Sequence, residues 1–383
     1  MYFDNAATTM VPQNIIDVVK LYAEQNYANA GSLHYAGIEA RNVLNKARSM
    51  VANCIGANDE QIIFTSGGSE SNNLAIIGVV EYLKKVGKTS IVTSSIEHPS
   101  VLATLDYVSK DEMTVWKLPV NSNGIVDIDS LKRRIEQSDV GLVSVMAVNN
   151  EIGSVQNVAE IGRLCKENNI LFHTDCVQAA GTIKIDVDEM NIDFLSMSGH
   201  KFHAPKGVGY LYVRNKEILN PIIFGGGQEF SLRAGTENVP CIIGMAQALV
   251  DVYKTGVSYA NLKSLFVEHI EEVCQRENIK VYFNGDSKTN LSKIVNLRFP
   301  GIDGQTLVLM CSAKDVCVSA GSACKSHSNN PSHVLRAIGL SEEDALSSIR
   351  VSFSGYNTPQ EVCLGAEIIV QCVKEMLGDN NGI

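Results

Sequence analysis

A chain of 383 residues with a formal net charge of −10 has no general attraction for nucleic acid or for an anionic membrane surface, so local groups must hold any anionic ligand. Hydrophobic residues make up 45% and charged residues 19% of the chain, which excludes extended disorder and allows a packed interior. The chain is longer than the chains that usually fold around a single hydrophobic core, which predicts one large domain and a smaller one.

Residues suited to chemistry begin at Asp4, and no apolar run is long enough to span a membrane. We therefore expect no secretion signal and a cytoplasmic location. The ten cysteines are scattered over expected helices and strands, without the CxxC or Cys/His clusters that hold a structural zinc. We expect no metal site and no disulfide framework, and we interpret Cys165 and Cys372 as small core residues.

The first half of the chain predicts a parallel sheet. A helix is expected at about 12–27, and over about 60–215 apolar runs of strand length alternate with amphipathic stretches of helix length. Strands are expected at 62–65, 90–93, 141–148, 170–174, 194–196 and 207–213. Helices are expected at 69–85, after His98, and at 157–168 with Asn157 as the capping residue.

After the glycine run at 225–227 the pattern changes. It predicts a long helical stretch at 240–277, strands at 280–283 and 294–299, and helices at 303–311 and 359–376. These elements indicate a smaller α+β domain, on which we expect the N-terminal helix to pack. The predicted division is an N-terminal segment 1–14, a large domain 15–250 and a small domain 251–383, which carries a cysteine loop at about 319–331.

A phosphate site is predicted where the strand at 62–65 meets the following helix, in Thr65-Ser-Gly-Gly68-Ser69-Glu-Ser-Asn72. Glycines allow main-chain N–H groups to approach an anion, the helix N-terminus adds partial positive charge, and Ser69 adds a hydroxyl donor. No Gly-Lys-[Ser/Thr] follows, so a monophosphate cup is favoured over a P-loop. The alternative is an ordinary capped turn between strand and helix.

A lysine follows the strand at 194–196, in Ser198-Gly-His200-Lys201. Enzymes with α/β folds build their sites at the carboxyl ends of strands. A lysine there can form a Schiff base if burial destabilises its ammonium. Ser198 and His200 can donate hydrogen bonds to a phosphate. The alternative is a solvated loop lysine, which residue type alone does not exclude.

Two further strand ends carry Asp175 and His98. An enzyme that uses pyridoxal phosphate (PLP) needs a carboxylate against the pyridine nitrogen, because the protonated ring acts as an electron sink. Gln178, three residues after Asp175, can reach the ring hydroxyl from the next helical turn. His98 can stack on the ring and move protons near neutral pH. Alternatively, Asp175 caps a helix and His98 is structural.

One cysteine, Cys324, lies in a run of small and polar residues from Ser319 to Pro331 that is unsuited to a core and predicts a mobile loop. Lys325 and His327 beside it favour the thiolate. An incidental surface thiol is the alternative. Arg350 lies in a predicted strand, where a buried arginine needs an anionic partner such as a substrate carboxylate.

In their order and joint presence, these segments resemble the cysteine desulfurases of the NifS/IscS type, which are fold-type I, class V aminotransferase-like PLP enzymes. The resemblance runs from Tyr2 to the strand around Arg350. The most specific matches are Ser198-Gly-His-Lys201, Asp175-x-x-Gln178, Asn149-Asn150-Glu151-Ile-Gly153, Arg233-Ala-Gly-Thr236-Glu-Asn238 and Gly321-Ser-Ala-Cys324.

By position, the resemblance implies that Lys201 is the Schiff-base lysine, that His98 stacks on the ring and that Asp175 is the pyridinium partner. The residues implied for the phosphate cup are Gly68, Ser69, Ser198 and His200, with Thr236 donated across a dimer interface. Those implied around the ring hydroxyl and the substrate are Gln178, Asn150, Asn29, His34 and Arg350.

The family's fold is a large domain with a mixed seven-stranded sheet and a small α+β domain, assembled as a homodimer. The resemblance implies conversion of L-cysteine to L-alanine, with the sulfur passed to Cys324 as a persulfide. The polar stretch after Cys324 is similar to that of members which serve iron–sulfur scaffolds or tRNA thiolation. The alternatives are a selenocysteine lyase, a PLP aminotransferase, and a non-catalytic sulfur-relay or scaffold-binding protein that keeps PLP only structurally.

Overall fold

The computed structural model describes residues 1–255, 259–286, 290, 292–321 and 330–379. In this part of the chain a main sheet has the strand order β1-β7-β6-β5-β4-β2-β3. β7 is antiparallel to β1 and β6, and the other neighbours are parallel. The strands are β1 Ile62–Thr65, β2 Ser90–Ser94, β3 Thr114–Leu118, β4 Val140–Ser144, β5 Leu171–Asp175, β6 Phe194–Ser198 and β7 Gly209–Val213. The predicted α/β fold with a mixed, mostly parallel seven-stranded sheet is confirmed.

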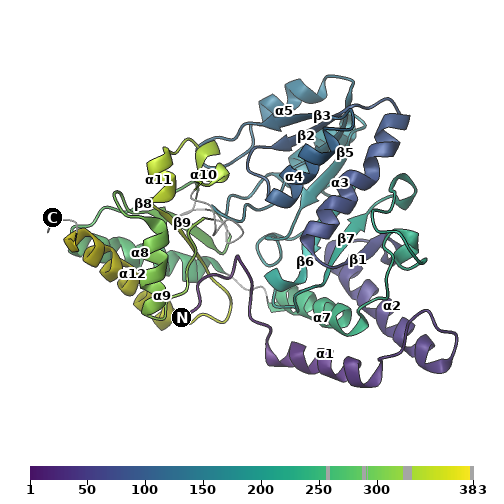
Figure 1. Ribbon diagram of the computed structural model, residues 1–383, viewed down its shortest axis with the longest axis horizontal. Coiled ribbons are helices and arrows are strands. Elements are labelled where there is room, and N and C mark those ends of the chain that lie inside the picture. The colour runs from purple at the N-terminus through teal and green to yellow at the C-terminus, as the bar shows by residue number, and fades with distance from the viewer. Residues whose placement is uncertain (256–258, 287–289, 291, 322–329, 380–383) are drawn as a thin grey trace.

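Helices cover both faces of the main sheet (Figure 1). Those on one face are α3 (Gly68–Lys85) and α4 (Pro99–Val108), and those on the other are α2 (Tyr35–Ile55), α5 (Ile128–Ile135), α6 (Val158–Glu167) and α7 (Val239–Thr255). Successive strand residues point to opposite faces. In β7, Tyr210 and Tyr212 pack on the α2 and α7 side, whereas Leu211 and Val213 pack on the α3 and α4 side.

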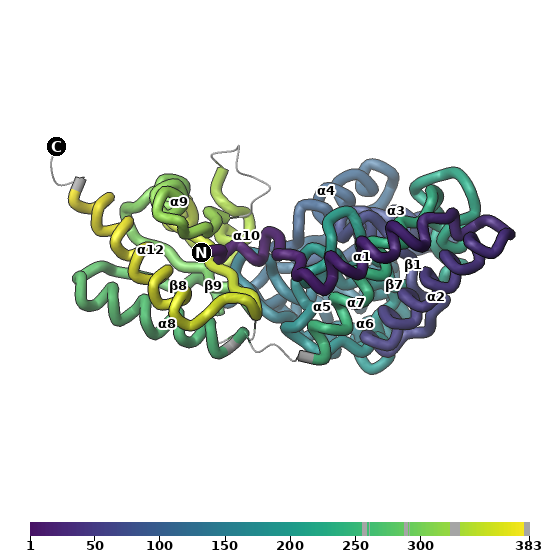
Figure 2. Tube along the Cα trace, turned by 90° about the horizontal axis from the view of Figure 1, so that it is seen from below, coloured from purple at the N-terminus to yellow at the C-terminus, as the bar shows by residue number. Residues whose placement is uncertain are grey.

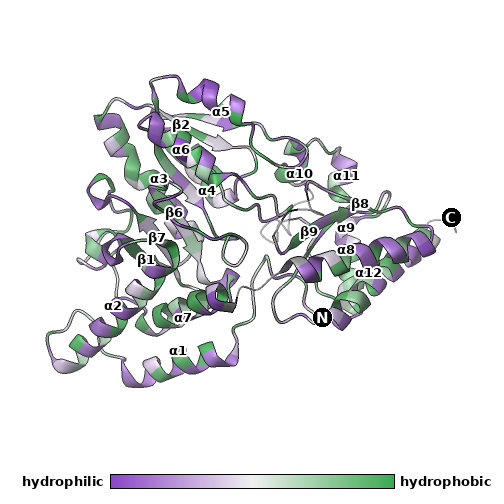
Figure 3. Cartoon of the chain, turned by 180° about the vertical axis from the view of Figure 1, so that it is seen from behind, coloured by the Kyte–Doolittle hydropathy of each residue, from purple (hydrophilic) through white to green (hydrophobic). Residues whose placement is uncertain are grey.

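A small antiparallel sheet in the order β10-β9-β8 forms a second core. Its strands are β8 Tyr282–Phe283, β9 Ile294–Arg298 and β10 Ser348–Ser352. The helices of this region are α8 (Tyr259–Arg276), α9 (Gly304–Ala313), α10 (His333–Ala337), α11 (Glu342–Leu346) and α12 (Pro359–Asp379). Hydrophobic and hydrophilic residues alternate along α8 and α12 in Figure 3, as expected for helices with one face on a core.

The N-terminal segment links the two cores (Figure 2). Phe3 packs edge-to-face on Phe353 in the small-sheet core, with ring centroids 5.8 Å apart. Six residues later, the Thr9 hydroxyl donates to the main-chain carbonyl of His200 beside the main sheet (2.9 Å). The chain therefore crosses from the small sheet to the main sheet within its first ten residues.

Helix α1 (Gln13–Gln25) packs along α7, and its Ile15 is buried in the main-sheet core. The expectation that this helix packs on the smaller C-terminal part is therefore wrong. Gly244 of α7 explains the close approach, because a Cβ there would lie 2.5 Å from Cγ2 of Val19.

Other element boundaries also differ from the sequence prediction. The long helix expected at 240–277 is two helices, α7 and α8, and β4 ends at Ser144, before the expected 148. α2, β3 and α5 are additional to the elements expected from the sequence. None of the described helices is both long enough and apolar enough to cross a lipid bilayer.

Candidate active site

The carboxyl ends of the main-sheet strands open into a cavity of about 440 Å³. This volume is within the range of roughly 300–1,000 Å³ that is usual for small-molecule sites. The strand ends supply one wall, the first turn of α3 another, and the N-terminal segment at Ala6, Ala7 and Thr8 a third. The lining includes these predicted site residues: Gly68, Ser69, His98, Asn150, Asp175, Gln178, Ser198, His200, Lys201 and Arg350.

One end of the cavity is shaped to hold an anion. The first-turn N–H groups of α3 have no acceptor within the helix, and Ser198 and His200 line the cavity opposite them. Gly67 has a φ of 152°, and a Cβ there would lie 3.3 Å from the Ser198 hydroxyl oxygen. Burial lowers the pKa of His200 to about 4, so its imidazole is neutral near pH 7.

A carboxylate, Glu70, also lines this end, but it is paired. Arg233 Nε donates to Glu70 Oε1 at 2.9 Å, and the Ser66 main-chain N–H donates to Oε2 at 2.9 Å. Burial alone would raise the pKa of Glu70, but these bonds lower it on balance. The ion pair therefore offsets a negative charge that would otherwise oppose an anion in the cup.

Lys201 lies in a single 3₁₀ turn, Gly199–Lys201, directly after β6. Its ammonium nitrogen donates to the carbonyl oxygens of Ala6 (2.8 Å) and Ala7 (2.7 Å). These bonds hold the lysine against the N-terminal segment and inside the cavity. The alternative interpretation of a solvated loop lysine is therefore excluded.

Asp175, at the end of β5, is 4% exposed and held on both carboxylate oxygens. Asn72 Nδ2 donates to Oδ2 at 2.8 Å, and the Val177 N–H donates to Oδ1 at 2.9 Å. Gln178 follows in a turn and donates from Nε2 to the Ala6 carbonyl at 2.8 Å. Its Oε1 is buried, and no protein group in the described structure bonds to it. Asp175 is therefore rigidly aimed at the cavity, and Gln178 presents an unused polar atom.

His98 lies across the cavity as the N-cap of α4. Its Nδ1 accepts from the Ser100 N–H at 3.1 Å and lies 2.8 Å from the Ser100 hydroxyl oxygen. Burial lowers the pKa of His98, and Asp175 opposes that shift. Because Nδ1 is an acceptor, the neutral ring carries its proton on Nε2.

Arg350, from β10, is the small sheet's contribution to the cavity and is 2% exposed. Its Nη2 pairs with Asp4 Oδ1 at 2.7 Å, and its Nη1 donates to the Asn150 carbonyl at 2.8 Å. Nε is buried without a partner among the described protein atoms. The guanidinium is thus fixed by groups from both sides of the molecule and can still offer hydrogen bonds to an anion.

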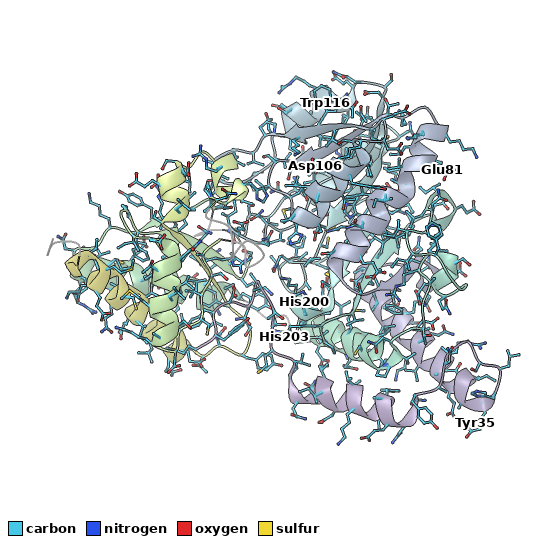
Figure 4. All side chains as sticks on the ribbon, viewed as in Figure 1. Tyr35, Glu81, Asp106, Trp116, His200 and His203 are labelled. Atoms are coloured by element: carbon cyan, nitrogen blue, oxygen red, sulfur yellow. The ribbon has the colours of Figure 1, made fainter. Side chains whose placement is uncertain are left out.

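Three predicted site residues are exposed and do not line the described cavity. Asn29 accepts from the Gly31 N–H, His34 caps α2, and Thr236 lies in the segment after Arg233. Figure 4 shows that Tyr35, the neighbour of His34, lies at the outer edge of the molecule, whereas His200 and His203 lie where the two cores meet. Cys324 lies outside the described residues.

Several contacts were not predicted from the sequence: Asn72 on Asp175, Ser100 on His98, Asp4 on Arg350, and the Ala6 and Ala7 carbonyls on Lys201. Asn72 had a sequence signal, since it lies one helical turn after Ser69 and shares its helix face. The Ala6 and Ala7 carbonyls had no such signal in the sequence, because every residue type carries the same main-chain carbonyl.

The fold and the cavity define a fold-type I enzyme that uses PLP, and comparisons with known proteins agree. Residues 1–364 match the family model described as aminotransferase class-V. A curated relative, "Cysteine desulfurase IscS" of Methanosarcina thermophila, is 39% identical over 380 residues, covering 98% of this chain and 92% of its own. The chain belongs to the aminotransferase class-V family, whose desulfurase branch depends on PLP.

Solved structures support the same assignment. A structure titled "NIFS-LIKE PROTEIN" superposes with a TM-score of 0.90 at 34% identity, covering 98% of this chain and 99% of its own. A second, titled "SspA in complex with cysteine", has a TM-score of 0.80 at 36% identity, covering 93% and 99%.

The cavity fits PLP on its own chemistry. The glycine turn and its helix N-terminus suit the phosphate, the fixed Asp175 carboxylate suits a pyridinium nitrogen, and the buried Gln178 Oε1 needs a hydrogen-bond donor. Lys201 lies within the same cavity, as a covalent attachment requires.

Proposed function

We propose that this protein is a cysteine desulfurase. The net reaction converts L-cysteine and the thiol of Cys324 into L-alanine and a persulfide on Cys324, so that one sulfur atom is transferred. The observation that carries this proposal is the convergence of Lys201, Asp175 and Arg350 on one cavity in a chain whose relatives are named cysteine desulfurases.

The main-sheet residues would hold the cofactor. Bound PLP supplies an electron sink for charge that develops at the α-carbon of an amino acid. We assign Lys201 to the covalent attachment and then to proton transfer, Asp175 to the ring nitrogen, and Gln178 to the ring hydroxyl. His98, which lines the same cavity, would stack on the ring with its neutral imidazole and hold a proton at Nε2.

We propose that the phosphate and the substrate bind at different ends of the cavity. Gly68, Ser69, Ser198 and His200 are proposed to bind the phosphate, as the anion-shaped end suggests. Arg350 and the Asn150 side chain are proposed to bind the substrate, because a guanidinium recognises a carboxylate by paired hydrogen bonds. The substrate is cysteine, in line with the names of the relatives.

The chain on either side of Cys324 supports its role as sulfur acceptor. Before it, Ser319 exchanges main-chain hydrogen bonds with Arg350, at 3.1 Å and 2.6 Å. After it, Ser332 caps α10 and its hydroxyl donates to Glu151. The described chain before and after Cys324 thus lies beside the cavity, next to Arg350 and Glu151.

A homodimer is proposed to complete the site. Asn29, His34 and Thr236 are exposed away from the cavity of their own chain, and large apolar side chains are exposed in the same segments. These are Tyr27, Leu33, Tyr35 and Phe224, at 80–87% exposure. A two-fold interface would bring both segments to the partner's cavity reciprocally. Light scattering should give twice the chain mass of 41.5 kDa for the active species; an active monomer would exclude this proposal.

We propose a cytoplasmic location and a protein acceptor for the sulfur, either an iron–sulfur scaffold or a tRNA-thiolation enzyme. The separate hydrophobic cores support the division into an N-terminal segment 1–14, a large domain 15–250 and a small domain 251–383. Because Val252 is buried in the main-sheet core, we propose that the boundary lies a few residues after 250.

Product analysis tests the function. The purified, PLP-loaded protein is incubated with cysteine, and alanine and sulfide are measured with and without a thiol reductant. A desulfurase forms alanine in stoichiometric excess only when the reductant releases the sulfur. Cleavage of selenocysteine but not of cysteine would favour a selenocysteine lyase. Transfer of the amino group to a keto acid would favour an aminotransferase, and the absence of any turnover would favour a scaffold-binding protein.

A further inference from the structure

A chain of hydrogen bonds joins two candidate site residues that lie on separate elements. Asn72 of α3 donates from Nδ2 to Asp175 Oδ2 at 2.8 Å and to the Ser100 hydroxyl oxygen at 2.9 Å. That hydroxyl oxygen lies 2.8 Å from Nδ1 of His98. All four side chains line the cavity. Asp175, at the end of β5, is thus connected to His98, the N-cap of α4, through two residues to which the proposed function gives no role.

The direction of each hydrogen bond in this chain follows from the Asp175 carboxylate. An ionised carboxylate only accepts hydrogen bonds, so it orients the Asn72 amide with the nitrogen toward it, and the second hydrogen of that nitrogen goes to Ser100. The Ser100 hydroxyl therefore accepts from Asn72, and its own proton is left for His98. The Ser100 main-chain N–H also donates to Nδ1 of His98, at 3.1 Å, which requires an Nδ1 without a proton.

A purely structural role does not explain the chain. Asn72 is 1% exposed, and its Oδ1 is buried with no partner in the described structure. Such an atom lowers stability, and a hydrophobic residue of similar shape would avoid that cost. His98 is also an unusual N-cap, because Ser, Thr, Asp and Asn are the preferred residues there. Departures from what the fold alone favours are expected where a site uses the residues.

The charges around His98 act in both directions. Burial lowers the pKa of its imidazole, and Asp175 opposes that shift. Of the other charged groups that face it, Lys201 and His333 lower the pKa and Glu151 raises it. The N-terminus of α4 also disfavours a positive charge at the N-cap. Because the contributions of these charges partly cancel, hydrogen bonds to the ring nitrogens carry weight in setting the protonation state.

We propose that Asn72 and Ser100 are positioning residues, which relay the orientation set by a carboxylate to the His98 imidazole and hold it neutral with its proton on Nε2. The carboxylate is that of Asp175. The last donor of the chain, the Ser100 hydroxyl, binds the neutral ring at Nδ1, and an imidazolium would have to give up that bond. No group in the described part of the chain bonds to Nε2, so this nitrogen is left for a ligand in the cavity. The inference rests on the proposed function only in identifying that ligand as cofactor and substrate.

NMR of the full-length, cofactor-free protein, with isotope-labelled histidine, tests the inference. His98→Gln identifies the His98 signals by their loss. In the unaltered protein near pH 7, the ring carbon and nitrogen shifts should be those of the Nε2–H tautomer. Ser100→Ala removes the hydroxyl, and Asn72→Leu removes the amide at nearly constant shape. Each should raise the pH midpoint of His98 protonation by on the order of half a pH unit, because the neutral ring loses an oriented donor.

Matched controls lie on the same helices. Asn73→Leu, one position further along α3, and Ser109→Ala, at the C-cap of α4, should leave the His98 midpoint unchanged. The double variant is the sharpest test, because Asn72 is proposed to act through the Ser100 hydroxyl. Asn72→Leu should therefore have no further effect in the Ser100→Ala protein, and this non-additivity distinguishes a chain from two independent contacts.

Three results would overturn the inference. The first is an Nδ1–H tautomer in the unaltered protein, a measurement that needs no variant and so decides the matter even if the variants do not fold. The second is a His98 midpoint that is unchanged or lower in Ser100→Ala or in Asn72→Leu. The third is additivity in the double variant, because Asn72 would then act on His98 by another route.

The NMR result does not depend on turnover. A protein that shows the predicted tautomer and midpoints but never forms alanine from cysteine would refute the proposed function and leave the inference standing. Conversely, a working desulfurase in which neither variant raises the His98 midpoint would refute only the inference. In the PLP-loaded protein, His98 should keep the Nε2–H tautomer, which extends the same spectroscopic readout to the complete site.

Discussion

The two sides of the cavity contribute different things. The main sheet presents functional side chains at or just after its strand ends, and some are fixed by hydrogen bonds to neighbours in sequence, as Asp175 is by Val177 and His98 is by Ser100. The small sheet and the N-terminal segment present charges and main-chain carbonyls that hold those side chains from a distance in sequence, as Ala6 holds Lys201. Substitutions in the first region should therefore remove catalytic function, whereas substitutions in the second should shift binding, proton affinity and stability.

The largest effect is expected at Lys201, on the main-sheet side. Lys201→Ala removes the only amine we assign to covalent cofactor attachment, so turnover should fall by at least about a thousandfold, or roughly 4 kcal/mol. The measurement is borohydride reduction followed by mass spectrometry, which should find no cofactor on the variant's peptides. A cofactor still linked to the protein, with cysteine turnover unchanged, would show that the attachment residue is another lysine.

The next largest effect is expected at Asp175. Asp175→Asn keeps the shape of the side chain, has one acceptor oxygen in place of two for Asn72 and Val177, and loses the charge that would hold a proton on the ring nitrogen. Bound PLP should remain, and kcat should fall about a hundredfold, or ~3 kcal/mol. Rates within a factor of a few of the unaltered enzyme, at full cofactor occupancy, would rule out this role.

On the small-sheet side, Lys293→Met should change stability with a defined pH dependence. The folded-state pKa is depressed from 10.5 to about 7, so the unfolded chain binds a proton that the folded chain resists. The protein therefore loses stability as pH falls from about 10.5 to about 7. This corresponds to at most roughly 5 kcal/mol of stability. The variant also loses the hydrogen bond from Lys293 Nζ to the Lys201 main-chain carbonyl, which offsets part of the stability gained on removing the buried charge. The variant should be more stable by roughly 2 kcal/mol at pH 7.

Denaturant titrations across pH measure that difference. The advantage of Lys293→Met should be largest at and below neutral pH and should shrink as the pH rises to about 10.5 and above, where the unfolded chain also loses the proton of Lys293. A constant difference at every pH would mean that packing and not charge explains it.

A smaller effect on binding is expected at Arg350. Arg350→Lys keeps a positive charge but cannot reproduce the fork that bonds Asp4 and the Asn150 carbonyl together. The KM for cysteine should rise about tenfold, or ~1.4 kcal/mol, with kcat less affected. Steady-state kinetics separate the two parameters, and a change confined to kcat would assign Arg350 to the chemical step.

The smallest effect is expected in the connection that carries Thr236. Glu229, Phe230 and Ser231 have φ values of 45°, 60° and 65°, which are left-handed for three consecutive residues that are not glycine. The buried Arg48–Glu229 ion pair, at 2.7 Å, holds this turn. Ser231→Gly should raise the free energy of unfolding by about 1 kcal/mol, because glycine adopts this backbone without strain. Ser49→Gly, in the helical α2, is the matched control and should lower it. A loss of stability in Ser231→Gly would contradict the strain argument.

The sequence predicted the parts of the site that follow from strand ends and helix starts. Asp175 and Ser198 each end a strand whose apolar pattern was visible, His98 lies between such a strand and the next helix, and the structure places all three on the cavity. Local pattern could not reveal contacts across long separations. Lys201 is held by Ala6, 195 residues away, and Arg350 by Asp4, 346 residues away. The same limit explains why the packing of α1 was predicted wrongly. Its amphipathic face predicts a helix but does not reveal that the helix packs against Gly244 of α7.

Mass spectrometry of the intact, PLP-loaded protein after brief exposure to cysteine without reductant tests the desulfurase mechanism most directly. Each chain should gain one sulfur atom, and digestion should map it to Cys324. The Cys324→Ser variant should gain none and form almost no alanine, although its bound cofactor still responds spectroscopically to cysteine. Sulfur found instead on another cysteine, such as Cys176 beside Asp175, or alanine formed by Cys324→Ser at the normal rate, would contradict the desulfurase mechanism.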